Sequence, residues 1–254
     1  VRGIRLAAEV EGVKEVVVSD ISREAANLAC FNVKQNNLTN LILVFNEDAN
    51  LLLNRYAAPR KRFDYIDVDP FGSPVAYVDS AVRALRDGGL LALTATDMAP
   101  LCGVHSKACV RKYGGKPLRT EYCHELAVRL LAGCLATIAA RHEMGIKVLF
   151  SHSTNHYIRL YAFVHYGAKH ADISIQKMGH ILHCFTCFHR EASQGMFSRL
   201  REECPECGYQ LKAAGPLWLG ELFDEAFCSL MEKDVKRLYL KQEKRMLRML
   251  SLAK

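Results

Sequence analysis

The sequence predicts an α/β protein with an open, doubly wound sheet, followed by a smaller α+β domain. Three observations lead to this expectation. Short β-branched runs alternate with helical segments early in the chain, two later β-rich runs lie a short turn apart, and two C-x-x-C pairs follow them. Half of the 254 residues are hydrophobic and 24% are charged, which excludes disorder, collagen and coiled coil as descriptions of the whole chain.

The first elements of the sheet are expected before residue 46. Residues 4–10 continue a helix, and residues 15–20 and 41–45 form buried strands. Between the strands, Ser22 can cap a helix that runs to Asn36. The buried side of that helix is expected to consist of apolar residues: Ala25, Leu28, Ala29, Phe31 and Val33.

Two more parallel strands are expected at 63–68 and 90–96. Between them, a helix opens at Ser73-Pro74 and continues to about Arg86, where Gly88-Gly89 ends it. This alternation of strands and helices favours a doubly wound sheet.

A long helix over 121–142 leads into two β-rich runs, 146–151 and 157–165. The polar turn between the runs is too short for a crossover helix, so the pair is expected to form an antiparallel hairpin. A parallel sheet that finishes in such a hairpin is typical of class I methyltransferases and unusual for a dehydrogenase.

Two domains are expected, a sheet domain at 1–166 and a C-terminal domain at 167–254. Both are interpreted as truncated, because Val1 is not Met, one strand is expected before it, and the helical region 217–254 ends without a cap. No uncharged apolar run approaches the roughly 18–20 residues of a membrane span, so no membrane partner is expected.

Acidic residues stand where strands are expected to end, at the sheet edge where open α/β folds bind ligands. They are Asp20, Asp48, Asp67 and Asp69. Asp20 could accept hydrogen bonds from ribose hydroxyls, as in an NAD site or an S-adenosylmethionine site, with Arg2 and Gly3 on the tail of a glycine-rich turn. Asp48 could meet an adenine amino group. Either carboxylate could instead act only as a cap or loop residue, and for Asp48 the cap of a helix starting at Ala49 is compatible with both roles.

The segment Asp67-Val68-Asp69-Pro70-Phe71-Gly72 resembles the Asn/Asp-Pro-Pro-Tyr/Phe motif of amino-group methyltransferases. An exocyclic amine on a base is a poor nucleophile, because its lone pair is delocalised into the ring. Asp69 and a backbone carbonyl left free by Pro70 can accept its two N–H bonds, while Phe71 offers a stacking face. The alternative is a tight strand-to-helix turn without chemistry.

A basic segment, expected to form a loop after the strand at 90–96, lies between Asp97 and Glu121, which enclose no other acidic residue. It carries five cations: Lys107, Arg111, Lys112, Lys116 and Arg119. Together with a net charge of +7, this segment favours contacts with a phosphate backbone, although a merely solvated loop is the alternative. The basic run at 233–248 is interpreted as one face of an amphipathic helix.

Two C-x-x-C pairs are separated by sixteen residues: Cys184 with Cys187, and Cys204 with Cys207. Each pair can place two thiolates on a tight knuckle, so the spacing predicts a structural zinc site within a ribbon at about 180–210. Two disulfides or free thiols are the alternatives. Six further cysteines are scattered in apolar or helical context, which indicates a reducing, cytoplasmic location.

Several strings in order carry a family resemblance: Arg2-Gly3-Ile4-Arg5, Asp48-Ala49-Asn50, Asp69-Pro70-Phe71-Gly72-Ser73-Pro74, residues 94–103 (TATDMAPLCG), Cys123-His124-Glu125 and residues 215–220 (GPLWLG). The chain resembles the tRNA (guanine-26) dimethyltransferase family, most closely its archaeal branch. The resemblance implies an enzyme that makes N(2),N(2)-dimethylguanosine in tRNA from S-adenosylmethionine, with no obligate protein partner evident. It places Arg2, Asp20, Asp48 and Ala49 in the cofactor site, Asp69 as the catalytic carboxylate and Phe71 against the guanine.

Other functions remain open from the sequence. One is a non-catalytic tRNA-binding paralogue, which the intact Asp69-Pro70-Phe71 disfavours. Another is an amino-methyltransferase that acts on DNA or protein. A dehydrogenase is disfavoured by the expected hairpin.

Overall fold

The computed structural model describes residues 1–238 and 240–251. Two compact units make up the chain, Val1–Arg62 and Phe63–Lys254. The predicted uncapped end of the last helix falls on residues 252–254, outside the described residues.

The first unit is a two-stranded parallel sheet with three helices. Its elements are α1 (Arg2–Glu9), β1 (Val16–Asp20), α2 (Arg23–Gln35), β2 (Ile42–Asn46) and α3 (Ala49–Tyr56). The two strands pair from Val16 opposite Ile42 to Asp20 opposite Asn46. Both predicted strands and the predicted Ser22 cap are therefore confirmed, and the Ser22 hydroxyl accepts a hydrogen bond from the Ala25 amide.

The buried face of α2 differs from the prediction. Ala26 and Val33 are buried, whereas Leu28 and Phe31 are exposed. Ala26 and Val33 are seven residues apart, two helical turns, so they share one face. Leu28 and Phe31 lie on another, where they form exposed apolar surface.

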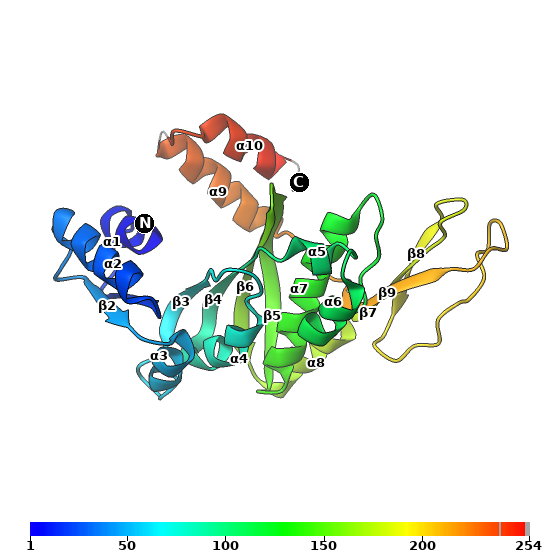
Figure 1. Ribbon diagram of the computed structural model, residues 1–254, viewed down its shortest axis with the longest axis horizontal. Coiled ribbons are helices and arrows are strands. Elements are labelled where there is room, and N and C mark those ends of the chain that lie inside the picture. The colour runs from blue at the N-terminus through cyan, green and yellow to red at the C-terminus, as the bar shows by residue number, and fades with distance from the viewer. Residues whose placement is uncertain (239, 252–254) are drawn as a thin grey trace. The chain divides into compact units, whose positions relative to one another are not determined.

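The second unit is built on a four-stranded mixed sheet of order β3-β4-β6-β5. Its strands are β3 (Phe63–Val68), β4 (Leu85–Ala95), β5 (Met144–Thr154) and β6 (Tyr157–Tyr166). β3 and β4 are parallel, and β6 is antiparallel to both β4 and β5. The predicted hairpin is confirmed, and its second strand lies between β4 and β5 (Figure 1).

The boundary between α4 (Val75–Ala84) and β4 lies earlier than predicted. The strand already begins at Leu85, and its pairing with β3 shifts between Phe63 and Tyr65. Gly88 adopts a φ of 71°, so the glycines lie in a strand irregularity rather than after a helix.

A single sheet was predicted for these strands, but within the described residues they form two. β1 pairs with β2 in one sheet, and β3 pairs with β4 in the other.

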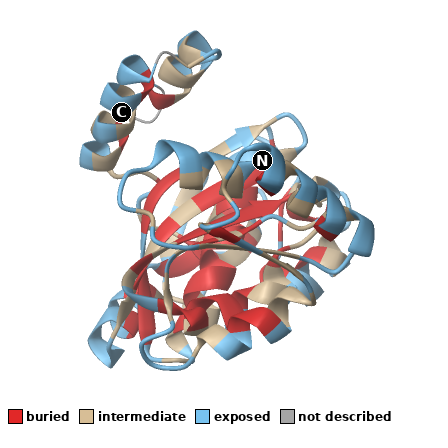
Figure 2. Cartoon of the chain, turned by 90° about the vertical axis from the view of Figure 1, so that its left-hand side faces the viewer, coloured by how far each residue is buried: buried red, intermediate tan, exposed pale blue. Residues whose placement is uncertain are grey.

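One face of the mixed sheet packs against α4, α7 (Cys123–Ala140) and α8 (Ala168–Gln176). Figure 2 shows the buried residues gathered in the strands and in the helices that pack on them. Side chains alternate along the strands: Leu93 and Leu160 are fully buried, whereas their neighbours Thr94 and Arg159 point to the other face. By length and composition α7 could cross a membrane, but 56% of its apolar window is buried, as in the core helix of a globular protein.

The described residues after α8 form a three-stranded antiparallel sheet and two helices. These elements are β7 (Met178–His183), β8 (Arg190–Gln194), β9 (Lys212–Trp218), α9 (Glu225–Arg237) and α10 (Glu243–Ser251). We call residues 178–218 the ribbon. The sequence missed α8 and placed Leu217-Trp218 in the closing helical region, whereas they end β9.

The C-terminal elements pack on the mixed sheet of the same unit. α7 contacts β9 and α8, and Asp224, which caps α9, forms an ion pair of 2.6 Å with Lys147 on β5. Contacts thus cross the predicted domain boundary at 166, and that boundary stays a prediction.

Candidate functional site

The loop after β3 presents the three residues expected to be catalytic. Asp69, Pro70 and Phe71 follow directly on the strand, and the Phe71 side chain is fully exposed. A large aromatic ring held away from the core offers a free face for stacking. The structure therefore presents these residues together in one exposed turn.

Backbone geometry fixes that turn to the next strand. Gly72 has a φ of 82°, in the left-handed region that favours glycine. Its amide donates to the Thr96 hydroxyl (2.7 Å), and the Thr96 amide donates back to the Gly72 carbonyl (2.9 Å). The loop after β3 is thus held to the residue that follows β4.

The basic segment is not a loop throughout, because it contains two short helices. α5 (Met98–Leu101) follows β4, and α6 (Ser106–Tyr113) ends at Gly114, whose φ is 73°. Lys107, Arg111 and Lys112 lie on α6, whereas Lys116 and Arg119 lie in the irregular chain after it. All five cations are exposed.

One of the five cations is already engaged. The Asp97 side chain is only 10% exposed. Its carboxylate accepts a hydrogen bond of 2.5 Å from the Tyr113 hydroxyl and forms an ion pair of 2.9 Å with Lys112. Burial raises the pKa of Tyr113, so its hydroxyl remains a donor to Asp97. Lys112 therefore anchors α6 at the end of β4, and its predicted contact with phosphate stays a prediction.

The basic segment also pairs with the ribbon through its backbone. Lys116 and Gly215 exchange two N–H···O=C bonds, each 2.8 Å long. A Cβ at Gly115 would lie 2.5 Å from the Pro216 carbonyl oxygen, so only glycine permits this approach. The segment and β9 are therefore fixed to each other.

In the first unit, Asp20 and Asp48 lie at the ends of neighbouring parallel strands. The Asp20 carboxylate accepts from the Ser22 amide (2.8 Å), and the Asn46 side chain donates to the Asp20 carbonyl (3.0 Å). Asp48 caps α3, accepting from the Asn50 and Leu51 amides at 2.8 and 3.3 Å, with Ala49 as the first helical residue. The cap expected for Asp48 is thus present.

Arg2 and Gly3 lie in the first turn of α1 and not on a turn preceding it. A Cβ at Gly3 would lie 2.9 Å from Val18 and 3.3 Å from Val16 on β1. The glycine therefore lets the helix approach the strand closely, the role of the last glycine in a dinucleotide-type turn.

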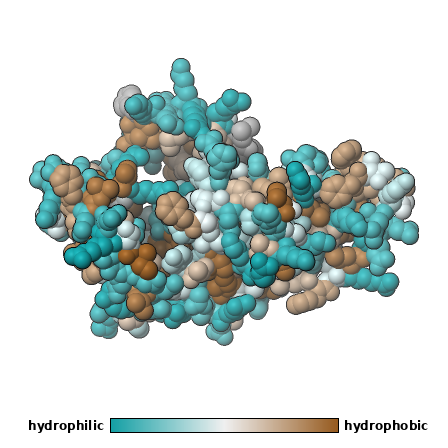
Figure 3. Space-filling model, viewed as in Figure 1, coloured by the Kyte–Doolittle hydropathy of each residue, from teal (hydrophilic) through white to brown (hydrophobic). Residues whose placement is uncertain are grey.

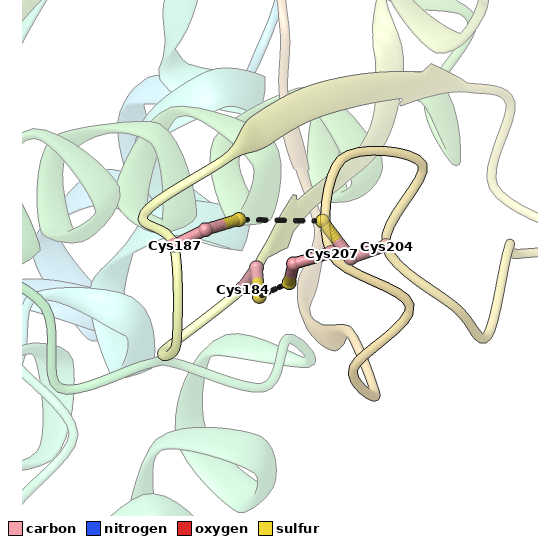
Figure 4. A group of neighbouring side chains, drawn as sticks. All are labelled: Cys184, Cys187, Cys204 and Cys207. Carbon is pink, nitrogen blue, oxygen red and sulfur yellow. Dashed lines mark hydrogen bonds between the residues drawn. The ribbon is translucent and has the colours of Figure 1, made fainter.

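The four paired cysteines converge at one end of the ribbon (Figure 4). Their sulfur atoms all lie within 4.8 Å of one another; Cys184 is 3.5 Å from Cys207, and Cys187 is 3.5 Å from Cys204. Hydrogen bonds from the Cys187 and Thr186 amides contribute to lowering the pKa of the Cys184 thiol to about 6.

The two knuckles share one backbone geometry. In the first, the Cys184 amide donates to the His189 carbonyl and the Phe188 amide donates back to the Cys184 carbonyl, both at 2.9 Å. Cys204 repeats both bonds with the equivalent residues of its own knuckle. The residue after each second cysteine is left-handed: φ is 62° at Phe188 and 73° at Gly208. The sequence indicated this turn only where glycine stands.

A further group of possible ligands escaped the sequence reasoning. Cys102, Cys123 and His124 have donor atoms within 4.8 Å of one another, and the Cys102 thiol lies 3.9 Å from the Cys123 carbonyl oxygen. Cys102 lies near the start of the basic segment, and the other two residues follow its end. Together they offer three donor atoms, one fewer than a closed structural metal site uses.

A buried ion pair was also not predicted from the sequence. Arg159 on β6 and Asp67 on β3 approach to 2.6 Å across β4. The signal available was a lone arginine inside an otherwise apolar and aromatic strand.

The antiparallel β6 between the parallel β4 and β5, with acidic residues at the end of β1 and after β3, defines the fold of class I S-adenosylmethionine-dependent methyltransferases. A structure of Trm1 from Pyrococcus horikoshii, in complex with S-adenosyl-L-methionine, matches 98% of this chain and 67% of its own, with a TM-score of 0.88 and 38% identity. The chain belongs to the N2,N2-dimethylguanosine tRNA methyltransferase family, whose model matches residues 1–254. The family resemblance found in the sequence is thereby confirmed.

Two curated relatives illustrate the match. A protein of Methanothermobacter thermautotrophicus named tRNA (guanine(26)-N(2))-dimethyltransferase is 45% identical over 238 residues, which are 93% of this chain and 60% of the relative. An Aquifex aeolicus protein whose name adds guanine 27 is 36% identical over 98% of this chain and 64% of its own length. The chain thus spans about three fifths of the length of these relatives.

Proposed function

We propose that the whole protein transfers methyl groups from S-adenosylmethionine to the exocyclic amino group of guanine 26 in tRNA. The products would be N(2)-methylguanosine and N(2),N(2)-dimethylguanosine. The observation that carries the proposal is the exposed Asp69-Pro70-Phe71 turn after β3, in a chain that belongs to this family. The names of the relatives support the choice of substrate.

The chemistry assigned to this turn is orientation of a weak nucleophile. Asp69 accepts one N–H of the guanine amine, a backbone carbonyl beside Pro70 accepts the other, and Phe71 stacks on the flipped base. The nitrogen lone pair is thereby directed at the methyl carbon. As the new N–C bond forms and the S–C bond breaks, the nitrogen gives up one proton, which Asp69 accepts. No covalent enzyme intermediate is needed.

The cofactor residues proposed are Arg2, Gly3, Asp20, Asp48 and Ala49. S-adenosylmethionine supplies an electrophilic methyl group on a sulfonium sulfur. Two features of the first unit fit it: adjacent strand ends that carry carboxylates, and a glycine that brings α1 against β1. Asp20 would bind the ribose hydroxyls, and Asp48 would set the edge on which the adenine lies.

The zinc proposal concerns Cys184, Cys187, Cys204 and Cys207 as ligands of one structural ion. Four thiols on two equivalent knuckles match the donor set of a closed tetrahedral site, which leaves no open position for chemistry. Two disulfides are the alternative, but the sulfur atoms of the two cross-knuckle pairs are 3.5 Å apart, well beyond the roughly 2.05 Å of a disulfide bond. All four sulfur atoms also lie within 4.8 Å of one another, as ligands of one ion would.

The tRNA surface proposed combines the basic segment with the ribbon. Lys107, Arg111, Lys116 and Arg119 would contact phosphates, whereas Lys112 acts mainly through Asp97. Figure 3 shows one face of the molecule as mainly hydrophilic, with apolar patches scattered among the polar side chains.

We propose a cytoplasmic location, because the scattered cysteines indicate a reducing compartment, and we propose no membrane or obligate protein partner.

The test is mass spectrometry of nucleosides from tRNA incubated with the full-length protein and S-adenosylmethionine. Mono- and dimethylguanosine should appear in a transcript with guanine 26 and be absent when that guanine is replaced by adenine. Product that persists in this variant and disappears when guanine 27 is replaced would move the target. A protein that binds tRNA without making product would be the non-catalytic paralogue, and methylation of duplex DNA instead would indicate the other nucleic-acid alternative.

A further inference from the structure

Arg159 lies at the centre of a polar network on the sheet face opposite α4 and α7. Its guanidinium donates to Asp67 on β3 (2.6 Å), to Thr94 on β4, and to the Tyr161 hydroxyl on its own strand (2.6 Å). The guanidinium also lies 4.9 Å from the centre of the Tyr161 ring. Tyr65 donates to the same Asp67 oxygen at 3.1 Å. One side chain on β6 is thus bonded to both parallel strands.

Burial makes this network costly as a source of stability alone. The side chains of Arg159 and Asp67 are 6% and 15% exposed. Removing two charges from water costs several kcal/mol per ion, and a well-packed apolar replacement is often as stable. A buried pair is therefore weak evidence for stability, and its place in the sheet is more informative.

The network lies at the carboxyl ends of β3 and β4, next to the proposed catalytic turn. Asp67 is the penultimate residue of β3, two positions before Asp69, and Thr94 is the penultimate residue of β4. Two residues beyond Thr94, Thr96 makes both hydrogen bonds to Gly72 at the far end of the turn. The turn follows β3 directly and is hydrogen-bonded to the residue after β4. Both of these strands are therefore bonded to one guanidinium.

We propose that Arg159 and Asp67 are positioning residues, which fix the ends of β3 and β4 so that the turn 69–72 presents Asp69 and Phe71 in one orientation. Asp67 acts through Arg159 and is not an alternative catalytic carboxylate. This inference rests on the proposed function, because the orientation matters for the guanine amine.

The decisive variant is Arg159→Lys in the full-length protein. Lysine keeps the positive charge beside Asp67, but a single ammonium cannot reproduce the planar fork that reaches Asp67, Thr94 and Tyr161 together. Since a misplacement of about 1 Å can cost on the order of a hundredfold in rate, kcat should fall at least about tenfold. KM for tRNA and for S-adenosylmethionine should each change less than about twofold, because neither binding surface includes Arg159.

The chain offers a matched control on the same two strands. Arg86 on β4 and Asp64 on β3 also form an ion pair, but at the opposite strand ends and with side chains 65% and 69% exposed. Arg86→Lys should leave kcat unchanged. The double variant Arg159→Gln/Asp67→Asn replaces the ion pair by two neutral amides, which leaves no unpaired charge. It should retain more activity than Arg159→Gln alone.

Hydrogen exchange separates failure of this inference from failure of the proposed function. Amides at 68–72 and 95–98 should exchange faster in Arg159→Lys than in Arg86→Lys, whether or not tRNA is methylated. A wild-type protein without methylation activity would contradict the proposed function. Hydrogen exchange alone would then test whether Arg159 and Asp67 fix the ends of β3 and β4. Normal kcat in Arg159→Lys, equal exchange in both variants, or a double variant no better than Arg159→Gln would overturn the inference.

Discussion

Replacing Cys204 by serine should unfold the knuckle end of the ribbon and leave the four-stranded sheet folded. The buried cluster at this end consists of Leu182, Cys184, Cys204 and Leu211. Its two leucines contribute about 1.5–3 kcal/mol each, whereas zinc binding by four such thiolates is worth about 10–16 kcal/mol in small zinc-binding peptides. A zinc ion at the proposed site would therefore contribute more to the stability of this end than the apolar cluster does, and the cluster could not replace it.

Hydrogen exchange and metal analysis together test this expectation. Loss of only a quarter of the free energy of zinc binding, about 3 kcal/mol, corresponds to more than a hundredfold in an equilibrium constant. Amide protection over 184–211 should fall by at least that factor, in the Cys204→Ser variant and in wild type treated with a chelator. Protection in β4 and β6 should persist, since their core is formed with α4 and α7.

Cys134→Ser is the control, because Cys134 is a buried cysteine of α7 outside the cluster. It should keep one zinc per chain. The reasoning fails if wild type purified without chelator contains no zinc, or if Cys204→Ser keeps both a full equivalent of zinc and normal protection.

Three further outcomes are expected. Asp69→Ala should lower the methylation rate on the order of a hundredfold to a thousandfold while binding of S-adenosylmethionine persists, and near-normal turnover with saturating tRNA would remove Asp69 from its role. Arg111→Ala should weaken binding of all tRNA sequences alike and flatten the salt dependence by about one unit of slope or slightly less, whereas Lys169→Ala, at an exposed lysine of α8, should not. Gly133→Ala should destabilise the fold by about 1–3 kcal/mol, because the new Cβ would lie 3.1 Å from the Leu217 Cα, and an unchanged melting temperature would contradict this packing.

Sequence patterns predicted the elements whose signals are local. The bounds of β3 were right because a short β-rich run is followed immediately by Asp-Pro. The β5–β6 hairpin was right because a short turn admits no other connection. The knuckle spacing likewise predicted the gathering of four sulfur atoms.

The remaining features depend on contacts between distant residues or on weak local signals. Asp67 and Arg159 are 92 positions apart, and no local pattern indicates which charged groups meet inside a sheet. α6 was read as part of a loop because its many cations masked the two buried positions, Cys109 and Tyr113. The α2 face was misjudged because Leu28 and Phe31 are apolar and yet exposed.

The backbone pairing of Lys116 with Gly215 has a consequence for how the protein would hold a polyanion. It fixes the basic segment and the ribbon at one separation, so an RNA bound by the first would be held at high effective concentration near the second. Affinity would then exceed what either surface provides alone, and loss of either one would abolish this avidity. Two weak surfaces, rigidly joined, would behave as a single bivalent receptor.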